Sequence, residues 1–249
     1  MITLSGSARL ISDLHLQPEQ TQVNARFECF LAQCATARID ALFILGDLFE
    51  YWIGDDARDD AFNAHIARLL KGLADTGVRI FFQHGNRDFL IGSAMATACG
   101  MSLLPEISQV GAGETAILLM HGDALCTDDL DYQQFRTMVR APIWQTSFLA
   151  RPLSERLAEV ARLRAGSKQA MQDKSAQIMD ASPGAVTDVL RQHGCRRLIH
   201  GHTHRPGVEH LMLDGQPAER WVLSDWTATR GDALVLDADG RLSRQSLVD

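Results

Sequence analysis

The sequence predicts a layered α/β domain. Short apolar runs alternate with amphipathic helical stretches along most of the chain. With 249 residues, of which 46% are hydrophobic and 22% charged, the chain is long enough to bury a sizeable core as one unit. Asp, His and Asn collect directly after the apolar runs, as expected where ligands bind at the carboxyl ends of strands in an α/β sheet.

The first half of the chain alternates strands with helices. ARLIS (Ala8–Ser12) and ALFIL (Ala41–Leu45) are short and apolar, which predicts buried strands. The intervening helices are predicted from apolar residues that recur three and four positions apart. These residues are Val23, Phe27, Phe30, Leu31 and Cys34 in the first helix, and Phe62, Ile66, Leu69, Leu70 and Leu73 in the second.

Further strands are predicted at VRIFF (Val78–Phe82) and AILLM (Ala116–Met120). Towards the end, RLIH (197–200), WVLS (221–224) and ALVLD (233–237) complete the set, with turns expected at Asp214-Gly215 and Asp239-Gly240. Between 128 and 180 the strand pattern disappears, and apolar residues lie on a helical background broken at prolines. We therefore expect one domain over 1–249 with a helical lid inserted at 128–180.

Composition excludes several classes of protein. No run approaches the roughly 20 apolar residues of a membrane span, and the opening MITLSGSARL lacks the pattern of a signal peptide, which favours the cytoplasm. Five cysteines without CxxC spacing argue against a disulfide framework or a thiolate zinc site. A net charge of -7 argues against a nucleic-acid partner, although residues 136–174 hold eight basic against three acidic residues and favour an anionic ligand or membrane surface.

Five polar motifs follow five predicted strands: ISDLH, GDLFE, HGNRD, HGD and GHTH. Because they converge at one edge of the fold, their side chains form a candidate metal site. The oxygen and imidazole donors favour Mn²⁺, Fe or Zn²⁺, and their number suits two ions roughly 3.5–4 Å apart that share a carboxylate. The candidate ligands are Asp13, His15, Asp47, Asn86, His121, His202 and His204.

Each motif alone has a simpler interpretation. His15 could be a hydrogen-bonded histidine at a strand end, and Asp13 or Asp47 could be helix N-caps. The histidines of GHTH and the preceding His200 could form a solvated loop. The five motifs in order, each at a strand end, favour the metal site.

The motifs DxH, GDxxE, GNRD, HGD and GHTH resemble those of the calcineurin-like metallophosphoesterases. LGDLFEYWIGDD, HGNRDFLIG, HGDALCTDD, IHGHTHRP and SKQAMQDKSAQIMD are similar, more particularly, to the branch of that family that acts in the lipid A pathway. The resemblance implies an α/β/β/α sandwich and two Mn²⁺ ions per chain. It implies hydrolysis of the pyrophosphate of UDP-2,3-diacylglucosamine to UMP and 2,3-diacylglucosamine 1-phosphate (lipid X), at the cytoplasmic face of the inner membrane.

Carried over residue by residue, the resemblance implies that Asp47 bridges the two ions. It places Asp13, His15, Asp47 and His204 on one ion, and Asp47, Asn86, His121 and His202 on the other. Catalytic roles fall on Asp47, Asn86, Arg87 and His202. The substrate contacts are Asn86, Arg87, Asp129, Ser167, Met171, Lys174 and His202, and Met171 departs from the short polar side chain of relatives, which puts a side-chain hydrogen bond there in doubt.

The expected mechanism is in-line attack of water on the α-phosphorus. Many relatives in the broader superfamily have His where this chain has Arg87, and a guanidinium cannot give up its proton at neutral pH. A phosphate leaving group, whose second pKa is about 6, needs no such acid. Arg87 therefore fits cleavage of an anhydride, where it clamps phosphoryl oxygens; the alternative is a surface ion pair with Asp88.

The apolar residues of the insertion have two possible roles. Most would pack lid helices onto the core, while Trp144, Phe148, Leu149 and Leu153 are candidates to line a groove for two acyl chains. The basic residues Arg151, Arg156, Arg162, Arg164, Lys168 and Lys174 would attract phosphate groups or lie on solvated helix faces. Two rival functions remain at this point: a metallophosphoesterase for another nucleotide or phosphate ester, and an inactive, metal-free scaffold.

Overall fold

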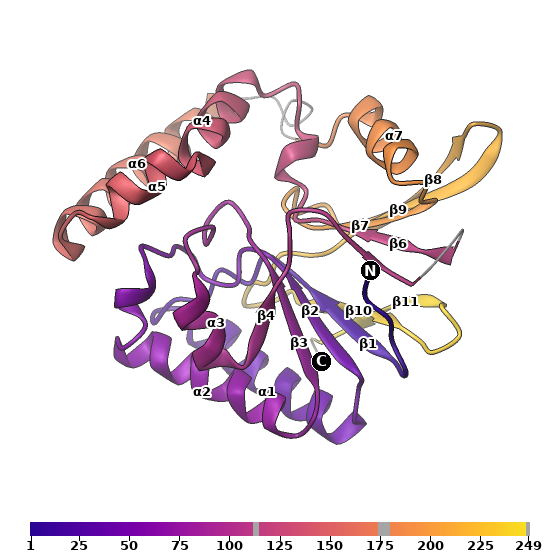
Figure 1. Ribbon diagram of the computed structural model, residues 1–249, viewed down its shortest axis with the longest axis horizontal. Coiled ribbons are helices and arrows are strands. Elements are labelled where there is room, and N and C mark those ends of the chain that lie inside the picture. The colour runs from indigo at the N-terminus through magenta and orange to yellow at the C-terminus, as the bar shows by residue number, and fades with distance from the viewer. Residues whose placement is uncertain (112–114, 174–179, 248–249) are drawn as a thin grey trace.

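Two β-sheets pack face to face in the computed structural model (Figure 1), which describes residues 1–111, 115–173 and 180–247, and the side chains of all of these except 165–173. The first sheet has six strands in the order β11-β10-β1-β2-β3-β4, and the second has five in the order β5-β6-β7-β9-β8. β1 to β4 run parallel, as do β6, β7 and β9.

The bounds of the first-sheet strands are β1 Ala8–Ile11, β2 Ala41–Leu45, β3 Arg79–Gln83, β4 Met101–Leu103, β10 Asp232–Leu236 and β11 Leu242–Ser246. Those of the second sheet are β5 Ser108–Val110, β6 Ile117–Leu119, β7 Arg197–His200, β8 Gly207–Leu213 and β9 Gln216–Val222. The helices are α1 Thr21–Ala37, α2 Ala61–Asp75, α3 Ser93–Cys99, α4 Leu130–Arg140, α5 Pro142–Leu149, α6 Leu153–Asp173 and α7 Pro183–Gln192.

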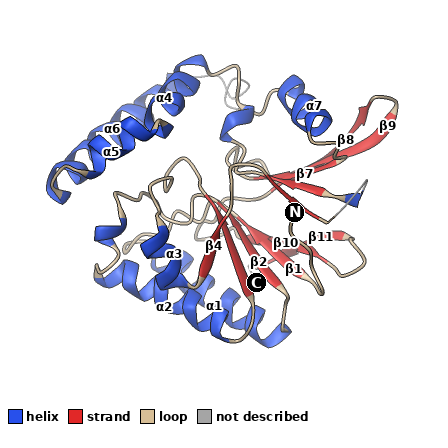
Figure 2. Cartoon of the chain, viewed as in Figure 1, coloured by secondary structure: helices blue, strands red, loops and turns tan. Residues whose placement is uncertain are grey.

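Period-2 alternation places the two faces of each central strand in different cores. In β2, Phe43 joins the apolar layer between the two sheets, whereas Leu42 and Ile44 face the layer beneath α1, α2 and α3. α7 covers the outer face of the second sheet through Val186 and Leu190. The helices thus enclose both sheets from outside (Figure 2), which confirms the expected α/β/β/α order.

α4, α5 and α6 lie beyond the carboxyl ends of the first-sheet strands (Figure 1), in the segment where the strand pattern is lost. Phe148 of α5 is buried in the same apolar cluster as the first-sheet strands, so this helix packs onto the core. No helix within the described ranges is long and apolar enough to cross a membrane.

Several elements differ from the sequence-based expectation. The helical and strand spacing gave no signal for β4 and β5, which have three residues each, or for β8, whose residues are mostly exposed. α3 and α7 were also missed. The strand expected at 221–224 is shifted, because β9 starts at Gln216 and ends at Val222.

Candidate metal centre

The five polar motifs meet at one edge of the sandwich. Asp13 and His15 follow β1, Asp47 follows β2 and Asn86 follows β3, all in the first sheet. His121 follows β6, and the GHTH loop follows β7, both in the second sheet. Because these strands are parallel within each sheet, their carboxyl ends bring residues that are up to 191 positions apart, Asp13 and His204, into contact.

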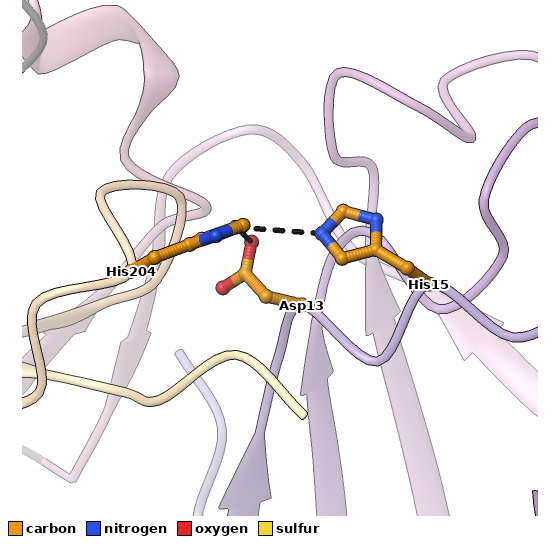
Figure 3. Close-up of side chains that lie close together, drawn as sticks. All are labelled: Asp13, His15 and His204. Carbon is orange, nitrogen blue, oxygen red and sulfur yellow. Dashed lines mark hydrogen bonds and ion pairs between the residues drawn. The ribbon is translucent and has the colours of Figure 1, made fainter. Parts of the chain in front are cut away.

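Asp13, His15 and His204 form the first ligand group (Figure 3). Nε2 of His204 lies 3.4 Å from Nε2 of His15 and 3.4 Å from Oδ1 of Asp13. Oδ2 of Asp47 lies 3.9 Å from the same His15 nitrogen. Two imidazole nitrogens and two carboxylate oxygens therefore face one small volume.

Asn86, His121 and His202 form the second ligand group. Oδ1 of Asn86 lies 3.0 Å from Nε2 of His121 and 2.8 Å from Nδ1 of His202. Oδ1 of Asp47 lies 3.7 Å from the same His121 nitrogen. Asp47 thus presents one carboxylate oxygen to each group, which is the geometry expected of a bridging ligand.

Hydrogen bonds from the surroundings orient the candidate ligands Asp13 and His121. Oδ2 of Asp13 accepts the Ser12 hydroxyl at 2.5 Å and the backbone N–H of His202 at 2.9 Å, while Oδ1 is buried and accepts no hydrogen bond. Nδ1 of His121 contacts the Leu45 carbonyl oxygen at 2.8 Å, and donation there leaves the Nε2 lone pair directed at the centre. Buried, unpartnered donors of this type fit divalent cations.

Burial and charge shift the titration of these groups. Burial, with Asp88 and Asp13 nearby, raises the pKa of Asp47 to about 7 although His121 opposes the shift. Burial lowers the pKa of His202 to about 4. Burial also raises the pKa of Asp13, but the neighbouring imidazoles outweigh it and hold that pKa below its usual range. Burial opposes the shift, but Asp47 and Asp13 raise the pKa of His121, and Asp13 raises that of His204. Imidazoles and carboxylates crowded into one buried volume are an environment that a cation stabilises.

The ligand loops adopt an unusual backbone conformation. Of the seven described non-glycine residues with positive φ, five are the candidate ligands Asp13, His15, Asp47, His202 and His204, with φ between 51° and 67°. This region costs an L-residue roughly 1–2 kcal/mol, so the surrounding structure must hold it in place. The simpler interpretation of Asp13 and Asp47 as N-caps is wrong, because neither precedes a helix.

Two glycines let the loops approach each other closely. A Cβ on Gly85 would lie 2.0 Å from Oδ1 of Asp47, and one on Gly201 would lie 2.2 Å from Oδ2 of Asp13. Neither distance is compatible with a side chain. The glycines of GNRD and GHTH therefore allow backbone to pack directly against the ligand carboxylates.

Asp88 is a supporting residue that the sequence motifs contained but did not explain. Its buried carboxylate accepts backbone N–H groups of Asp47 at 3.2 Å, Leu48 at 2.7 Å and Gly85 at 2.9 Å. It joins the GDLFE and GNRD loops, so the expected alternative of a surface Arg87–Asp88 pair is wrong. Among the described residues no carboxylate pairs with Arg87, whose Nε is buried without a hydrogen bond.

Three further carboxylates lie behind the ligands and were missed. Oε2 of Glu50 lies 3.4 Å from Nδ1 of His15, and Oδ2 of Asp225 lies 3.8 Å from Nδ1 of His204. Asp123 lies buried two residues after His121. Glu50 and Asp123 lie within the GDLFE and HGD motifs, so the sequence contained a signal for these two carboxylates. Asp225 lies in the loop after β9 and belongs to none of the motifs.

The structure describes the side chains of only some of the remaining predicted substrate contacts. Asp129 caps α4, since its side chain accepts the backbone N–H of Tyr132 at 3.1 Å. Ser167 and Met171 belong to α6, but their side chains lie outside the described set, and Lys174 lies outside the described residues. Of the three GHTH-region histidines, His200 is fully buried and only His204 is exposed, so the solvated-loop interpretation is wrong for His200.

A family model described as calcineurin-like phosphoesterase matches residues 9–206. The chain belongs to this family. Membership implies a divalent metal centre, which agrees with the clusters Asp13–His15–His204 and Asp13–Asp47–His121, whose ligand atoms lie within 4.8 Å of one another in each cluster. The calcineurin-like phosphoesterase fold also accounts for the two sheets between helices.

Individual relatives cover nearly the whole chain. A protein from Enterobacter sp. (strain 638) named UDP-2,3-diacylglucosamine hydrolase is 50% identical over 92% of this chain and 95% of its own. One of the same name from Chromohalobacter salexigens is 46% identical over 92% of this chain and 93% of its own. A solved dimetal phosphatase from Danio rerio is 13% identical with a TM-score of 0.48, over 97% of this chain and 98% of its own.

Proposed function

We propose that this calcineurin-like phosphoesterase hydrolyses the pyrophosphate bond of UDP-2,3-diacylglucosamine, with water attacking the α-phosphorus, to give UMP and 2,3-diacylglucosamine 1-phosphate. Relatives of that name at 46% and 50% identity over 92% of the chain support the substrate. The observation that carries the chemistry is the pair of ligand groups on either side of Asp47. This centre suits hydrolysis at phosphorus.

The proposed cofactor is a pair of Mn²⁺ ions. Asp13, His15, Asp47 and His204 would hold one, and Asp47, Asn86, His121 and His202 the other. The Asp13–His15–His204 cluster supports the first set, and the contacts of Asn86 with His121 and His202 support the second. Bound cations would supply a water of lowered pKa and neutralise charge that develops on the phosphoryl oxygens. Oxygen and imidazole donors without thiolate favour a metal of this hardness.

Arg87 is the proposed clamp for the phosphoryl oxygens. Its backbone N–H donates to Oδ1 of Asp47 at 2.8 Å, which fixes the residue beside the bridging carboxylate. Its buried Nε has no hydrogen bond in the described structure and is available to an anion. A guanidinium stays charged and offers two donors in one plane, which matches a phosphate group.

The helical insertion is proposed to be a lid that contacts the substrate. The rings of Trp144 and Phe148 stack at 4.8 Å, and Phe89 lies 6.2 Å from Trp144, which forms an aromatic cluster next to the GNRD loop. Phe148 is buried in the core, so the exposed apolar candidates for the acyl chains are Leu149 and Leu153, which are 40% and 37% exposed. Acyl chains would gain about 0.8 kcal/mol for each CH₂ buried there.

Most arginines of the insertion contact carboxylates, which limits their proposed role. Arg156 is buried against Asp56, and Arg164 pairs with Glu50. Arg151, in the turn before α6, pairs with Glu155 of that helix, and Arg162 pairs with Glu159 within it. Attraction of the diphosphate or of anionic headgroups at the cytoplasmic face of the inner membrane would therefore depend on Arg87, Lys168 and Lys174. The remaining proposed substrate contacts, Asn86, Asp129, Ser167, Met171 and His202, would act through hydrogen bonds or packing.

An isotope experiment tests the proposed reaction. Metal-stripped protein is supplied with Mn²⁺ and UDP-2,3-diacylglucosamine in ¹⁸O-labelled water. We expect the label in UMP. Label in the lipid phosphate would exclude attack at the α-phosphorus, and absence of hydrolysis with Mn²⁺ bound would exclude the substrate.

Replacing Arg87 by Ala tests the clamp. Loss of a charge-stabilising donor should lower kcat/KM about 100-fold or more, while Mn²⁺ content stays at the wild-type level, because the Asp47 contact of this residue uses only the backbone N–H. Metal content is measured by elemental analysis of the purified variant. Simultaneous loss of Mn²⁺ would show that Arg87 supports the ligands instead.

A further inference from the structure

Asp123 lies directly behind the second ligand group and has no part in the proposed chemistry. It follows His121 by two residues, in a 3-10 turn over Asp123–Leu125, and its side chain is 2% exposed. A buried carboxylate at such a place needs strong partners. Those partners come from outside the sandwich.

One face of α4 supplies all of these partners. Tyr132, Arg136 and Arg140 are spaced four residues apart, so their side chains lie along one face of the helix. All three donate to Oδ2 of Asp123: the Tyr132 hydroxyl at 3.0 Å, Nε of Arg136 at 2.8 Å and Nη2 of Arg140 at 3.4 Å. One carboxylate oxygen therefore gathers three side chains of α4, and Gln133 of the same helix adds a hydrogen bond from its Nε2 to the backbone carbonyl of Asp123 at 2.8 Å.

Two of these donors, Tyr132 and Arg140, and the backbone of the HGD turn each lead to one member of the second ligand group. The ring of Tyr132 stacks on His202, with centroids 5.7 Å apart and planes inclined by 30°. Nη2 of Arg140 also donates to the Gly85 carbonyl at 2.9 Å, one residue before Asn86. The backbone of the HGD turn connects Asp123 to His121.

We propose that Asp123 is a positioning residue that fixes Asn86, His121 and His202 relative to one another through the Tyr132–Arg136–Arg140 face of α4. The inference rests on the proposed function, because it assigns a role in the same metal centre. It makes α4 part of that centre as well as part of the lid. Residues behind metal ligands commonly set affinity and activity.

The first ligand group provides an internal comparison. Within the described residues, His15 and His204 contact neither Asp123 nor the three donors of α4; their outer partners are Glu50 and Asp225. A defect in positioning should therefore weaken the binding of the second ion and leave the binding of the first ion unchanged. A general loss of folding would affect both.

Asp123→Asn is the direct test, since it keeps the shape of the side chain and removes the charge. Mn²⁺ is titrated into metal-stripped protein by calorimetry, and the spin-coupled Mn²⁺ pair is followed by electron paramagnetic resonance. We expect the second ion to bind about 10- to 100-fold more weakly, with the first ion unchanged. Arg140→Gln should weaken the same ion, and the double variant should lose less than the two single effects combined, because both residues act through one contact.

Asp131→Asn is the matched control, because Asp131 lies on the exposed side of the first turn of α4. It should bind both ions as the wild type does. Equal weakening of both ions in Asp123→Asn, or wild-type binding of both, would overturn the proposal. If Asp123→Asn does not fold, Tyr132→Phe removes one of the three donors alone, and the same selective loss at the second ion, smaller in size, is required.

These titrations need no substrate, so they separate two failures. A wild-type protein that hydrolyses UDP-2,3-diacylglucosamine while Asp123→Asn keeps normal Mn²⁺ affinity leaves the proposed function intact and removes the role of Asp123. A protein that does not hydrolyse this substrate loses the proposed function. In that case, weaker binding of the second ion alone in Asp123→Asn would still establish the positioning role of Asp123.

Discussion

The candidate ligands combine ordinary side-chain chemistry with unusual backbone. The sequence motifs contain all seven candidate donors, and the structure brings their side chains together, while their role as metal ligands stays a prediction. They gave no indication that Asp13, His15, Asp47, His202 and His204 have positive φ. Backbone conformation of this kind depends on how neighbouring loops pack, and no local propensity predicts it for aspartate or histidine in five separate places.

His204 permits a test of this backbone strain, since its side chain is 41% exposed and its removal leaves no core cavity. Both His204→Gly and His204→Ala delete the ligand. Because glycine adopts positive φ freely, the Gly variant should be more stable than the Ala variant by about 0.5–1 kcal/mol after the entropy of glycine in the unfolded chain is included. Urea unfolding of the metal-free variants measures the difference. Equal stability, or a more stable Ala variant, would show that φ 54° carries no cost here.

His200 gives a prediction about pH. Nε of Arg220 donates to its Nε2 at 2.9 Å, so the ring is neutral with its proton on Nδ1. Burial, reinforced by Arg220, lowers the pKa of His200 to about 3. Between that value and its unfolded pKa near 6.5, the unfolded state binds more protons. The contribution of the neutral, buried His200 to the free energy of unfolding is thus fully present above pH 6.5 and is lost as the pH falls below that value.

The comparison of wild type with His200→Gln isolates this effect, because glutamine can still accept from Arg220 and does not titrate. The free energy of unfolding of the wild type should fall more steeply below pH 6.5, by up to about 1.4 kcal/mol per pH unit. Denaturant titrations at a series of pH values provide the measurement. Parallel curves for the two proteins would contradict a neutral, buried His200.

At the scale of elements, the sequence predicted those with strong periodicity and missed those without it. β2 and β7 have the expected bounds, since each is a short apolar run. β4 and β5 are too short for a pattern, and exposed β8 depends on pairing with β9 rather than on burial. The helices of the insertion follow from their spacing and prolines, but their attachment to the core depends on distant ion pairs that no local pattern contains.

Arg156 is the clearest such attachment. It is 2% exposed and donates to the Ile53 carbonyl at 2.5 Å and to Oδ1 of Asp56 at 2.9 Å. Gly54 makes room for it, since a Cβ there would lie 2.4 Å from its Nη1. This buried guanidinium thus fastens α6 to the loop after β2, and the more exposed Arg164–Glu50 pair adds a second link to the same loop.

Replacing Arg156 by Met should loosen α6 without unfolding the sandwich. We expect a loss of about 1–3 kcal/mol in unfolding free energy, from the charged hydrogen bonds removed. Amide hydrogen exchange should become faster over 153–164 and stay unchanged in β1 to β3. Arg162→Met is the control, because Arg162 is 72% exposed and pairs only within its helix. Unchanged exchange in α6 would show that Arg156 is not the attachment.

At the scale of the whole molecule, the centre exists because two sheets end at the same edge. The first sheet supplies Asp13, His15, Asp47 and Asn86, and the second supplies His121, His202 and His204. The order of motifs predicted that the loops converge, but the division between two sheets came from the family resemblance. Cations held between the sheets would also join them, so ligand positions and stability of the sandwich depend on each other.

Anomalous diffraction from crystals of the Mn²⁺-loaded protein, recorded at the manganese edge, tests the two-ion centre most directly. Our account predicts two peaks roughly 3.5–4 Å apart, with the Asp47 carboxylate between them, one peak among Asp13, His15 and His204 and the other among Asn86, His121 and His202. A single peak, or no peak with these side chains directed away from one another, would contradict it.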